Sequence, residues 1–231
     1  MTKAIKFLCL FILFTTVFLI YGVNAMAVNT NFSISNITEE KKNTVINNLD
    51  ISLIEEPSKT TIECFDVNDN GMIALGHTDY NNAIISIYDS NGIFKYGYSF
   101  KYNASFGIEW NDDDINIYLI RSDILVVLDP DANVVDVVAV NNTVENDRYK
   151  NDCVLSSEKM VGDAKYSLRN NMGILNFVST SYSQLIKTSS DGEEIILYNV
   201  NNFQTIKTIV FVCCAVVFVA LAIYTIFKKR S

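Results

Sequence analysis

The chain has 231 residues, 49% of them hydrophobic, and a formal net charge of −8. Residues 28–204 hold all 26 acidic residues but only 12 of the 18 basic ones, so this stretch alone carries a net charge of −14. An acidic field of this size repels nucleic acid and anionic lipid, so we expect neither as a partner of this stretch. The hydrophobic excess lies instead at the two ends of the chain.

The first segment has the layout of a secretory signal peptide. Two lysines precede the apolar run Phe7–Tyr21, and small residues follow at Ala25 and Ala27. A short positive region, an apolar stretch and small residues near the end are typical of a signal that is removed during export. We therefore predict a signal peptide over residues 1–27. The alternative is an uncleaved signal anchor, for which the apolar run is short.

Residues 28–59 are polar, rich in asparagine and only weakly patterned. We expect a flexible lead-in that includes one short helical turn within Asn29–Asn48 and a strand at Asp50–Ile54. Pro57 then interrupts the pattern, because proline has no N–H group to donate to a sheet.

From Thr60 onward the sequence consists of short apolar-rich runs separated by turn signals. Four runs lie within residues 60–101, four within 105–140, and a less regular set within 165–200 includes a predicted strand over Gly173–Thr180. The turn between the last two runs of a unit recurs at Asp89–Gly92, Asp129–Asn133 and Ser189–Gly192. The turn between the first two runs of a unit recurs at Asn68–Gly71, Asn111–Asp114 and Asn170–Gly173. Four short strands per unit of about 40 residues are typical of β-propeller blades.

These units resemble the blades of the NHL and TolB-like β-propeller families, in which a last hairpin of the form strand-D-x-x-G-strand recurs in every blade. The resemblance covers residues 60–200 and is carried by turn spacing and alternation. It implies an all-β domain that forms a propeller or a partial propeller. Because propellers usually close with four or more blades, either Asp50–Ile54 contributes to a fourth unit or the assembly stays open. A sandwich of hairpins is the alternative fold.

The other end of the chain reads as a membrane anchor. Ile209–Phe227 contains no charge and would span about 28 Å as a helix, close to the ~30 Å hydrocarbon core of a bilayer. We predict a transmembrane helix over residues 205–227 and a short basic cytoplasmic tail over residues 228–231. The positive flank consists of Lys228, Lys229 and Arg230. By the positive-inside rule, residues 60–204 then form an extracytoplasmic domain of a single-pass plasma-membrane protein.

Cys64 and Cys153 are the only cysteines of the predicted ectodomain. They could form one disulfide, which would close a long loop and stabilise the fold by about 4 kcal/mol. The alternative is two unpaired thiols. Neither has a neighbouring histidine or a C-x-x-C partner, so we expect no reactive cysteine.

Asp66, Asn68 and Asn70 are weak candidates for a surface calcium site, because D-V-N-D-N-G resembles the opening of a calcium-binding loop. Position twelve of such a loop is a carboxylate, whereas this sequence has His77 there. Asn, Asp and Gly are also the residues that a tight turn requires, and we interpret the segment as a turn. The three carboxylates of Asp112–Asp114 could hold a weak surface cation, although a solvated loop is the simpler interpretation. We expect no other cofactor.

Aromatic residues gather in one strand, where alternation puts Phe94, Tyr96, Tyr98 and Phe100 on one face. They form either a stacking platform for a ligand or, as we favour, packing between units. Trp110 is the aromatic residue that we expect to be partly exposed.

Catalytic patterns are scarce. His77 is the only histidine, which we expect on the surface or lining a loop, and the sequence has no G-x-S-x-G, H-E-x-x-H or glycine-rich phosphate loop. We assign no catalytic residue. The predicted function is a binding or accessory domain for a protein partner or for self-association. The alternative is an extracytoplasmic hydrolase or lyase of the propeller type that uses acidic loop residues.

Overall fold

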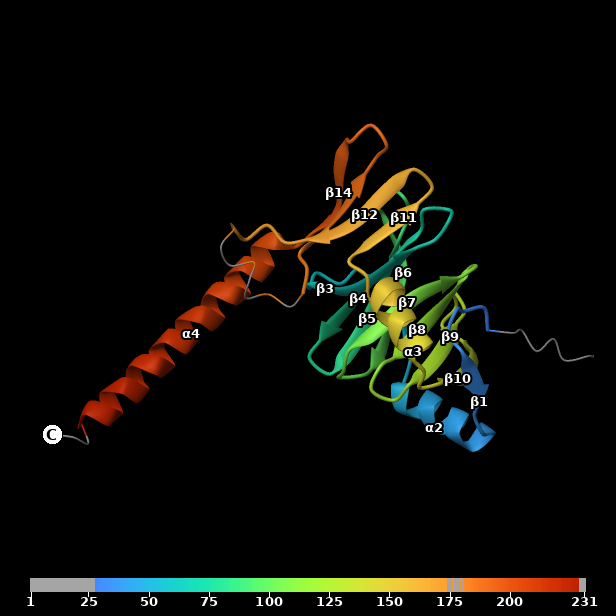
Figure 1. Cartoon of the computed structure of the whole chain (residues 1–231), viewed down its shortest axis with the longest axis horizontal. Coiled ribbons are helices and arrows are strands. Elements are labelled where there is room, and N and C mark those ends of the chain that lie inside the picture. Colours follow the sequence, from blue (N-terminus) through green and yellow to red (C-terminus); the bar gives the residue numbers. More distant parts are fainter. Residues whose placement is uncertain (1–27, 174–175, 177–178, 180, 229–231) are drawn as a thin grey trace, which may run out of the picture.

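The computed structural model describes residues 28–173, 176, 179 and 181–228. The predicted signal peptide over residues 1–27 lies outside the described residues. Three antiparallel sheets form the body of the molecule, and a long C-terminal helix projects from it (Figure 1). The prediction of a mostly β body with one apolar C-terminal helix is confirmed.

Each sheet contains four strands that follow one another along the chain and pair with their neighbours. The first sheet holds β3 (Ile62–Val67), β4 (Ile73–Asp79), β5 (Asn82–Tyr88) and β6 (Phe94–Lys101). The second sheet holds β7 (Phe106–Asn111), β8 (Asp114–Leu119), β9 (Ile124–Leu128) and β10 (Val134–Val140). The third sheet holds β11 (Glu158–Val161), β12 (Ala164–Arg169), β13 (Gln184–Thr188) and β14 (Glu194–Asn199). The strands of the first two sheets follow the eight apolar-rich runs of the sequence.

The third sheet differs from the prediction in its first half. It begins with β11, which we did not predict, and β12 pairs directly with β13, as in the pair Arg169 and Gln184. The predicted strand over Gly173–Thr180 is wrong where the structure describes it, because the side chain of Asn176 closes a compact loop there. Its Oδ1 accepts a hydrogen bond from Met172 N at 2.9 Å.

Residues 28–59, which we predicted to be a flexible lead-in, contribute strands to the first two sheets. They form β1 (Ile34–Asn36), α2 (Glu39–Leu49) and β2 (Ser52–Ile54). The strand β1 adds a fifth strand to the second sheet at β10, and β2 adds a fifth strand to the first sheet at β6. Helix α2 begins where Thr38 Oγ1 accepts a hydrogen bond from Lys41 N. Neither strand contributes to a fourth unit.

Three turns of the first two sheets are closed by the same hydrogen bonds. In one turn, Asp89 Oδ1 accepts from the N–H groups of Asn91 and Ile93, both at 3.0 Å. Asp129 and Asn68 accept the corresponding pair of bonds in their own turns. The fourth residue of each turn has a positive φ, which explains the glycines found at that place. The third unit departs from the prediction, since its first hairpin turn lies between β11 and β12 and not at residues 170–173.

The three sheets stack with the first sheet in the middle. One face of the first sheet packs against the second sheet, where residues such as Ile85, Phe106 and Ile117 are fully buried. The opposite face packs against the third sheet through Phe65 and Leu185. Each sheet therefore contributes a layer to one continuous body.

Helical segments cover the outer face of the second sheet. They are α3 (Val144–Tyr149) and the π-helical turn η1 (Lys150–Val154), and both lie in the segment that connects β10 to β11. Phe32 of the lead-in is buried in the same layer. The third sheet has no comparable cover among the described residues, and its last strand, β14, has no fifth strand beside it.

The aromatic face of β6 is core and not a ligand platform. Tyr98 and Phe100 are fully buried between the first two sheets, and Tyr96 packs beside them. Phe94 packs instead toward the third sheet, because a β-bulge at Ile87 and Tyr88 shifts its register.

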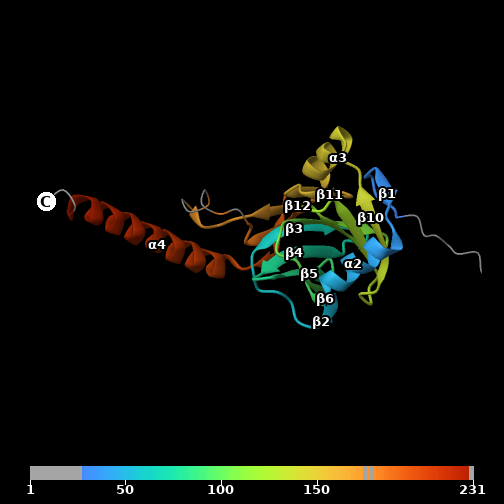
Figure 2. The ribbon, with the colours of Figure 1, turned by 90° about the horizontal axis from the view of Figure 1, so that it is seen from below.

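The C-terminal helix α4 (Asn201–Lys228) points away from the body (Figure 2). It is long and apolar enough to cross a membrane. The helix starts before the predicted residue 205, because its first turns pack on the body, where the side chains of Gln204 and Thr208 are buried. Of the predicted basic flank, Lys228 ends the helix, whereas Lys229 and Arg230 lie outside the described residues.

Candidate binding cleft at the ends of the first strands

An acidic cleft lies where the first strands of the three sheets meet. It has a volume of about 710 Å³. The ends of β3 and β7, with the turns that follow them, form most of its wall, and α3, η1 and β11 complete it. The residues that line it include Asp66, Asp69, Glu109, Trp110, Asp112, Asp113, Tyr149 and Lys159.

Asp66 connects the three sheets at the base of this cleft. It belongs to β3 and is only 8% exposed. Its Oδ2 accepts a hydrogen bond from Trp110 N in β7 at 2.8 Å, and its Oδ1 accepts one from Lys159 Nζ in β11 at 2.8 Å. A buried carboxylate needs such partners, because an unpaired charge in the protein interior is costly. Asp66 is therefore a structural carboxylate in this state of the protein.

Glu109, the neighbour of Trp110 in β7, is also held by several donors. Tyr149 OH donates to Glu109 Oε1, and Thr30 Oγ1 donates to Glu109 Oε2 at 2.8 Å. Burial and the hydrogen bond to Glu109 raise the pKa of Tyr149 well above its usual value. Tyr149 therefore stays a neutral donor, which keeps helix α3 attached to the second sheet.

The rim of the cleft carries carboxylates that have no basic partner among the described residues. Asp69 lies in the turn after β3, and Asp112 and Asp113 form the two-residue turn between β7 and β8. All three are exposed. Burial raises the pKa of the neighbouring Asp114, and the negative charges of Asp129, Asp113 and Asp112 raise it further. The rim thus concentrates negative charge that Lys159, bound to Asp66, does not neutralise.

Trp110 supplies an aromatic wall between these carboxylates. It is half-buried, which confirms the expectation of partial exposure. Its indole Nε1 is buried and has no hydrogen-bond partner among the described residues. An indole N–H normally finds an acceptor when it is removed from water, so this donor is an unsatisfied buried group beside the cleft.

The predicted calcium candidates lie at the cleft but serve the turn. Asn68 Oδ1 accepts from Asn70 N at 3.0 Å and from Met72 N at 2.9 Å, and Asp66 is occupied as described above. Within the described residues, no three acidic, histidine or cysteine side chains gather as a metal site would require. The turn uses Asn68 and Asn70, whereas Asp66 binds Trp110 and Lys159, and the weak calcium site stays a hypothesis.

Cys64 and Cys153 are free thiols in the structure. Cys64 is buried between the first two sheets, whereas Cys153 is exposed on η1. A disulfide would need both sulfur atoms in one place, so the predicted alternative of unpaired thiols describes this state. Burial also raises the pKa of Cys64 well above its usual value, so this thiol is unreactive.

His77 is buried within β4, so the expectation of a surface or loop-lining histidine is wrong. Its Nδ1 lies 3.2 Å from the carbonyl oxygen of Thr61, and its ring packs against Tyr198. A histidine enclosed in this way cannot reach a substrate.

Sequence reasoning missed several cleft residues, namely Glu109, Tyr149 and Lys159. Lys159 was missed because β11 was not recognised as a strand. The partnership of Glu109 with Tyr149 joins residues 40 positions apart, and only the packing of α3 on the second sheet brings them together.

No protein-family model matches this chain, and no curated protein matches its sequence.

Proposed function

We propose that this chain is a single-pass membrane protein that presents an acidic, propeller-like binding domain outside the cytoplasm. Its partner is a protein, and the cleft at Asp66 and Trp110 receives a basic segment of that partner. The observation that carries the proposal is the cleft itself, in which exposed carboxylates that have no basic partner in the described part of the chain surround a half-buried tryptophan.

The anchoring part of the proposal is supported by helix α4. The helix is long and apolar enough to cross a bilayer, and Lys228, Lys229 and Arg230 follow its apolar run in the sequence. Basic residues that follow a membrane span favour the cytoplasmic side, so the sheets are held on the opposite side.

The propeller-like part rests on the arrangement of the sheets. Each contains a meander of four strands, and the first strands, β3, β7 and β11, all reach the central cleft. In propellers, the first strand of each blade lines the central axis and the ligand binds near it. Three such units form an open partial propeller, whose unclosed side remains available to a partner.

The chemistry of the cleft favours binding over hydrolysis or elimination. The two inner carboxylates, Asp66 and Glu109, already accept several hydrogen bonds each. The exposed carboxylates of the rim attract cations, and aromatic faces bind lysine and arginine side chains by cation–π contact. A segment rich in arginine or lysine satisfies both features.

The chain provides its own reporter for this proposal, because Trp110 is its only tryptophan. Full-length protein in detergent micelles is titrated with a decapeptide of alternating lysine and glycine, and the emission of Trp110 is followed. We expect a saturable change in emission that weakens with salt.

The test variant is Asp69→Asn, Asp112→Asn and Asp113→Asn together, which removes rim charge at nearly constant shape. We expect affinity for the peptide to fall by about tenfold or more, which corresponds to at least about 1.4 kcal/mol. The control neutralises three exposed acids elsewhere, Glu40→Gln, Asp191→Asn and Glu193→Gln. Equal losses in both triple variants would show that the attraction comes from overall charge, and the cleft would then not be the binding site.

A further inference from the structure

A second surface of the domain lies beside the point where α4 leaves it. Helix α4 is fixed to the body by its first two turns, where Gln204 Nε2 donates to the carbonyl oxygen of Ser181 at 2.7 Å. Thr208 is the last described side chain of the helix that is buried against the body, 3.8 Å from the sulfur of Met172. From Ile209 to Val219, the helix extends beyond the body, and most of its apolar side chains are exposed. If α4 spans a bilayer, the membrane surface lies near this exit point.

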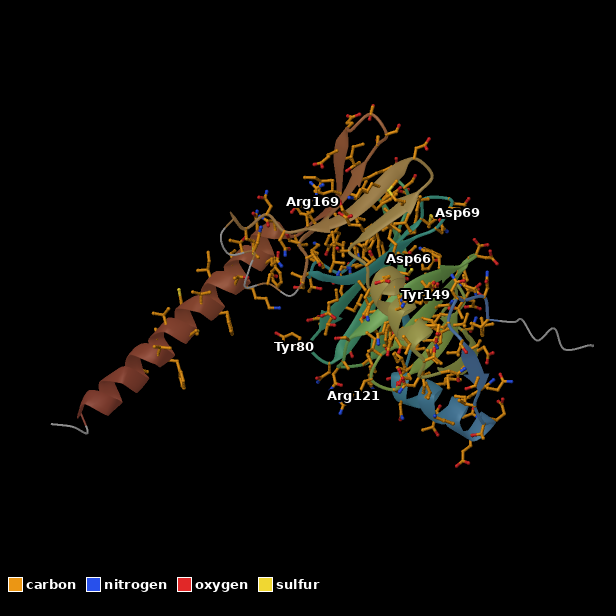
Figure 3. The ribbon with its side chains drawn as sticks, in the orientation of Figure 1. Asp66, Asp69, Tyr80, Arg121, Tyr149 and Arg169 are labelled. Carbon is orange, nitrogen blue, oxygen red and sulfur yellow. The ribbon has the colours of Figure 1, made fainter. Side chains whose placement is uncertain are left out.

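The loops around the exit point and the first turns of the helix together line a hollow. The hollow has a volume of about 880 Å³ and is lined by Phe203 and Lys207 of α4 together with Tyr80 of the turn between β4 and β5. Figure 3 places Tyr80 and Arg121 on the side of the body toward which α4 extends, while Asp69 of the cleft lies farther away. Tyr80 therefore occupies the level at which the helix enters the membrane.

One property of Tyr80 has no explanation within the domain, because its side chain is 94% exposed. Its positive φ of +53° belongs to the two-residue hairpin turn, since Asp112 and Gly162 have a positive φ at the same place in two-residue turns of the other two sheets. An aromatic side chain this exposed, close to the exit point of the helix, indicates a contact beyond the chain. Tyrosine is enriched where proteins cross the boundary between lipid and water, because its ring is apolar and its hydroxyl polar.

Neighbouring loops extend this surface. Tyr80, Lys101 and Tyr102 line a second hollow of about 630 Å³, and Arg121 N donates to Tyr102 OH at 3.4 Å. The first hollow also contains acidic residues such as Glu63 beside Lys207, so the surface as a whole is not basic. Its contact with a membrane consequently depends on aromatic insertion and not on attraction to anionic lipid.

We infer that this surface, defined by Tyr80, Tyr102, Arg121 and Phe203, rests on the headgroup layer of the membrane that holds α4, with the ring of Tyr80 inserted into it. The inference rests on the anchoring role proposed for α4. It also sets the orientation of the domain. Strand β3 runs from Ile62, near the hollow at α4, to Val67 at the acidic cleft. The cleft therefore opens away from the membrane, toward proteins on the same side.

The test uses tryptophan as a depth reporter in the full-length protein, with Trp110→Phe as background. Single tryptophans are introduced as Tyr80→Trp, as Phe203→Trp on the anchor, and as Ile93→Trp. Ile93 is exposed in the turn after β5, at the opposite end of that strand from Tyr80. The proteins are reconstituted in phosphatidylcholine vesicles with and without a spin-label quencher on the headgroup. We expect quenching and blue-shifted emission for Trp at positions 80 and 203 but not at position 93. High salt should leave the quenching unchanged.

Quenching at position 203 without quenching at position 80 would overturn the inference and leave the anchoring proposal intact. Equal quenching at positions 80 and 93 would also overturn it, because the domain would then have no preferred face. Absence of quenching at all three positions would refute membrane anchoring by α4, and with it the inference. A thermal unfolding curve like that of the background protein shows that Tyr80→Trp is folded.

Discussion

At the scale of single residues, Asp66 links three layers that the chain builds separately. Its carboxylate lies on β3 and binds the backbone of β7 and the side chain of Lys159 on β11. The side chain of Lys159 is mostly buried in this contact. Hydrogen bonds to a charged group in such surroundings are stronger than those between neutral groups. The three sheets therefore depend on one another at this point.

Replacing Asp66 by alanine should destabilise the protein strongly. The change leaves the ammonium group of Lys159 without its carboxylate and Trp110 N without an acceptor. We expect the free energy of unfolding to fall by about 2–4 kcal/mol. Urea unfolding of the full chain in detergent micelles, followed by Trp110 emission, measures this loss. As a control, Lys101→Ala removes the exposed ion pair with Asp50 and should cost far less, because solvent screens exposed pairs. Similar losses for both variants would contradict the linking role of Asp66.

His77 should make the fold sensitive to mild acid. Burial lowers the pKa of His77 from 6.5 to about 4. Between these two values the unfolded chain binds a proton that the folded chain does not, so stability falls as pH falls. The free energy of unfolding should drop by about 3 kcal/mol between pH 7 and pH 4, over and above the effect of other groups.

Denaturant midpoints at pH 7 and pH 4 measure this effect, with His77→Asn as the comparison. Asparagine cannot take up the proton, so the variant should be less stable at pH 7 but should lose much less on acidification. The same loss in both proteins would assign the acid sensitivity to other groups.

At the scale of elements, the first two sheets come so close together that one backbone position has no room for a side chain. A Cβ atom at Gly76 of β4 would lie 2.4 Å from Cys64 Sγ and 2.9 Å from Ile108 Cδ1. This glycine is therefore required by the contact between sheets and not by a turn.

Gly76→Ala should push the two sheets apart. Overpacking in a filled core costs about 1–3 kcal/mol, and we expect a value in the upper part of this range. Removal of the nearest clashing atom by Cys64→Ala should recover part of the loss, so the double variant should be more stable than the sum of the single changes predicts. Urea unfolding of the four proteins gives the coupling energy, and strict additivity would argue against this close contact.

The strands of the first two sheets could be predicted from sequence because local signals agree there. Apolar alternation and Asx-Gly turns occur together from β3 to β10, and the turn bonds of Asp89 and Asp129 follow from residue type alone. The strand β11 has the sequence E-K-M-V, which offers only two apolar residues and no turn signal before it. Helix α3 is polar and is stabilised by its contact with the second sheet. This contact cannot be predicted from the local sequence.

The cleft was predictable only in part. Residue type alone singled out Asp66, Trp110 and the carboxylates of residues 112–114. The sequence did not show that these residues come together in one cleft. Lys159 and Tyr149 reach the site through packing between sheets and helices that are far apart in sequence. The pairing of Asp66 with Lys159 spans 93 positions.

At the scale of the whole molecule, the two surfaces lie at opposite ends of the same strands. The acidic cleft is at one end of β3, and the hollow beside α4 is at the other. The core of the first sheet, covered on both faces, separates them.

The two added edge strands have a consequence for how the molecule is assembled during synthesis. Ile34 pairs with Val140, and Ser52 pairs with Ser99, so the segment translated first completes sheets whose other strands appear much later. Folding cannot proceed simply from the N-terminus onward, because β1 has no partner until β10 has been made. The earliest part of the domain to leave the ribosome is then among the last to find its place, and a chain interrupted before residue 140 would carry an unattached N-terminal segment.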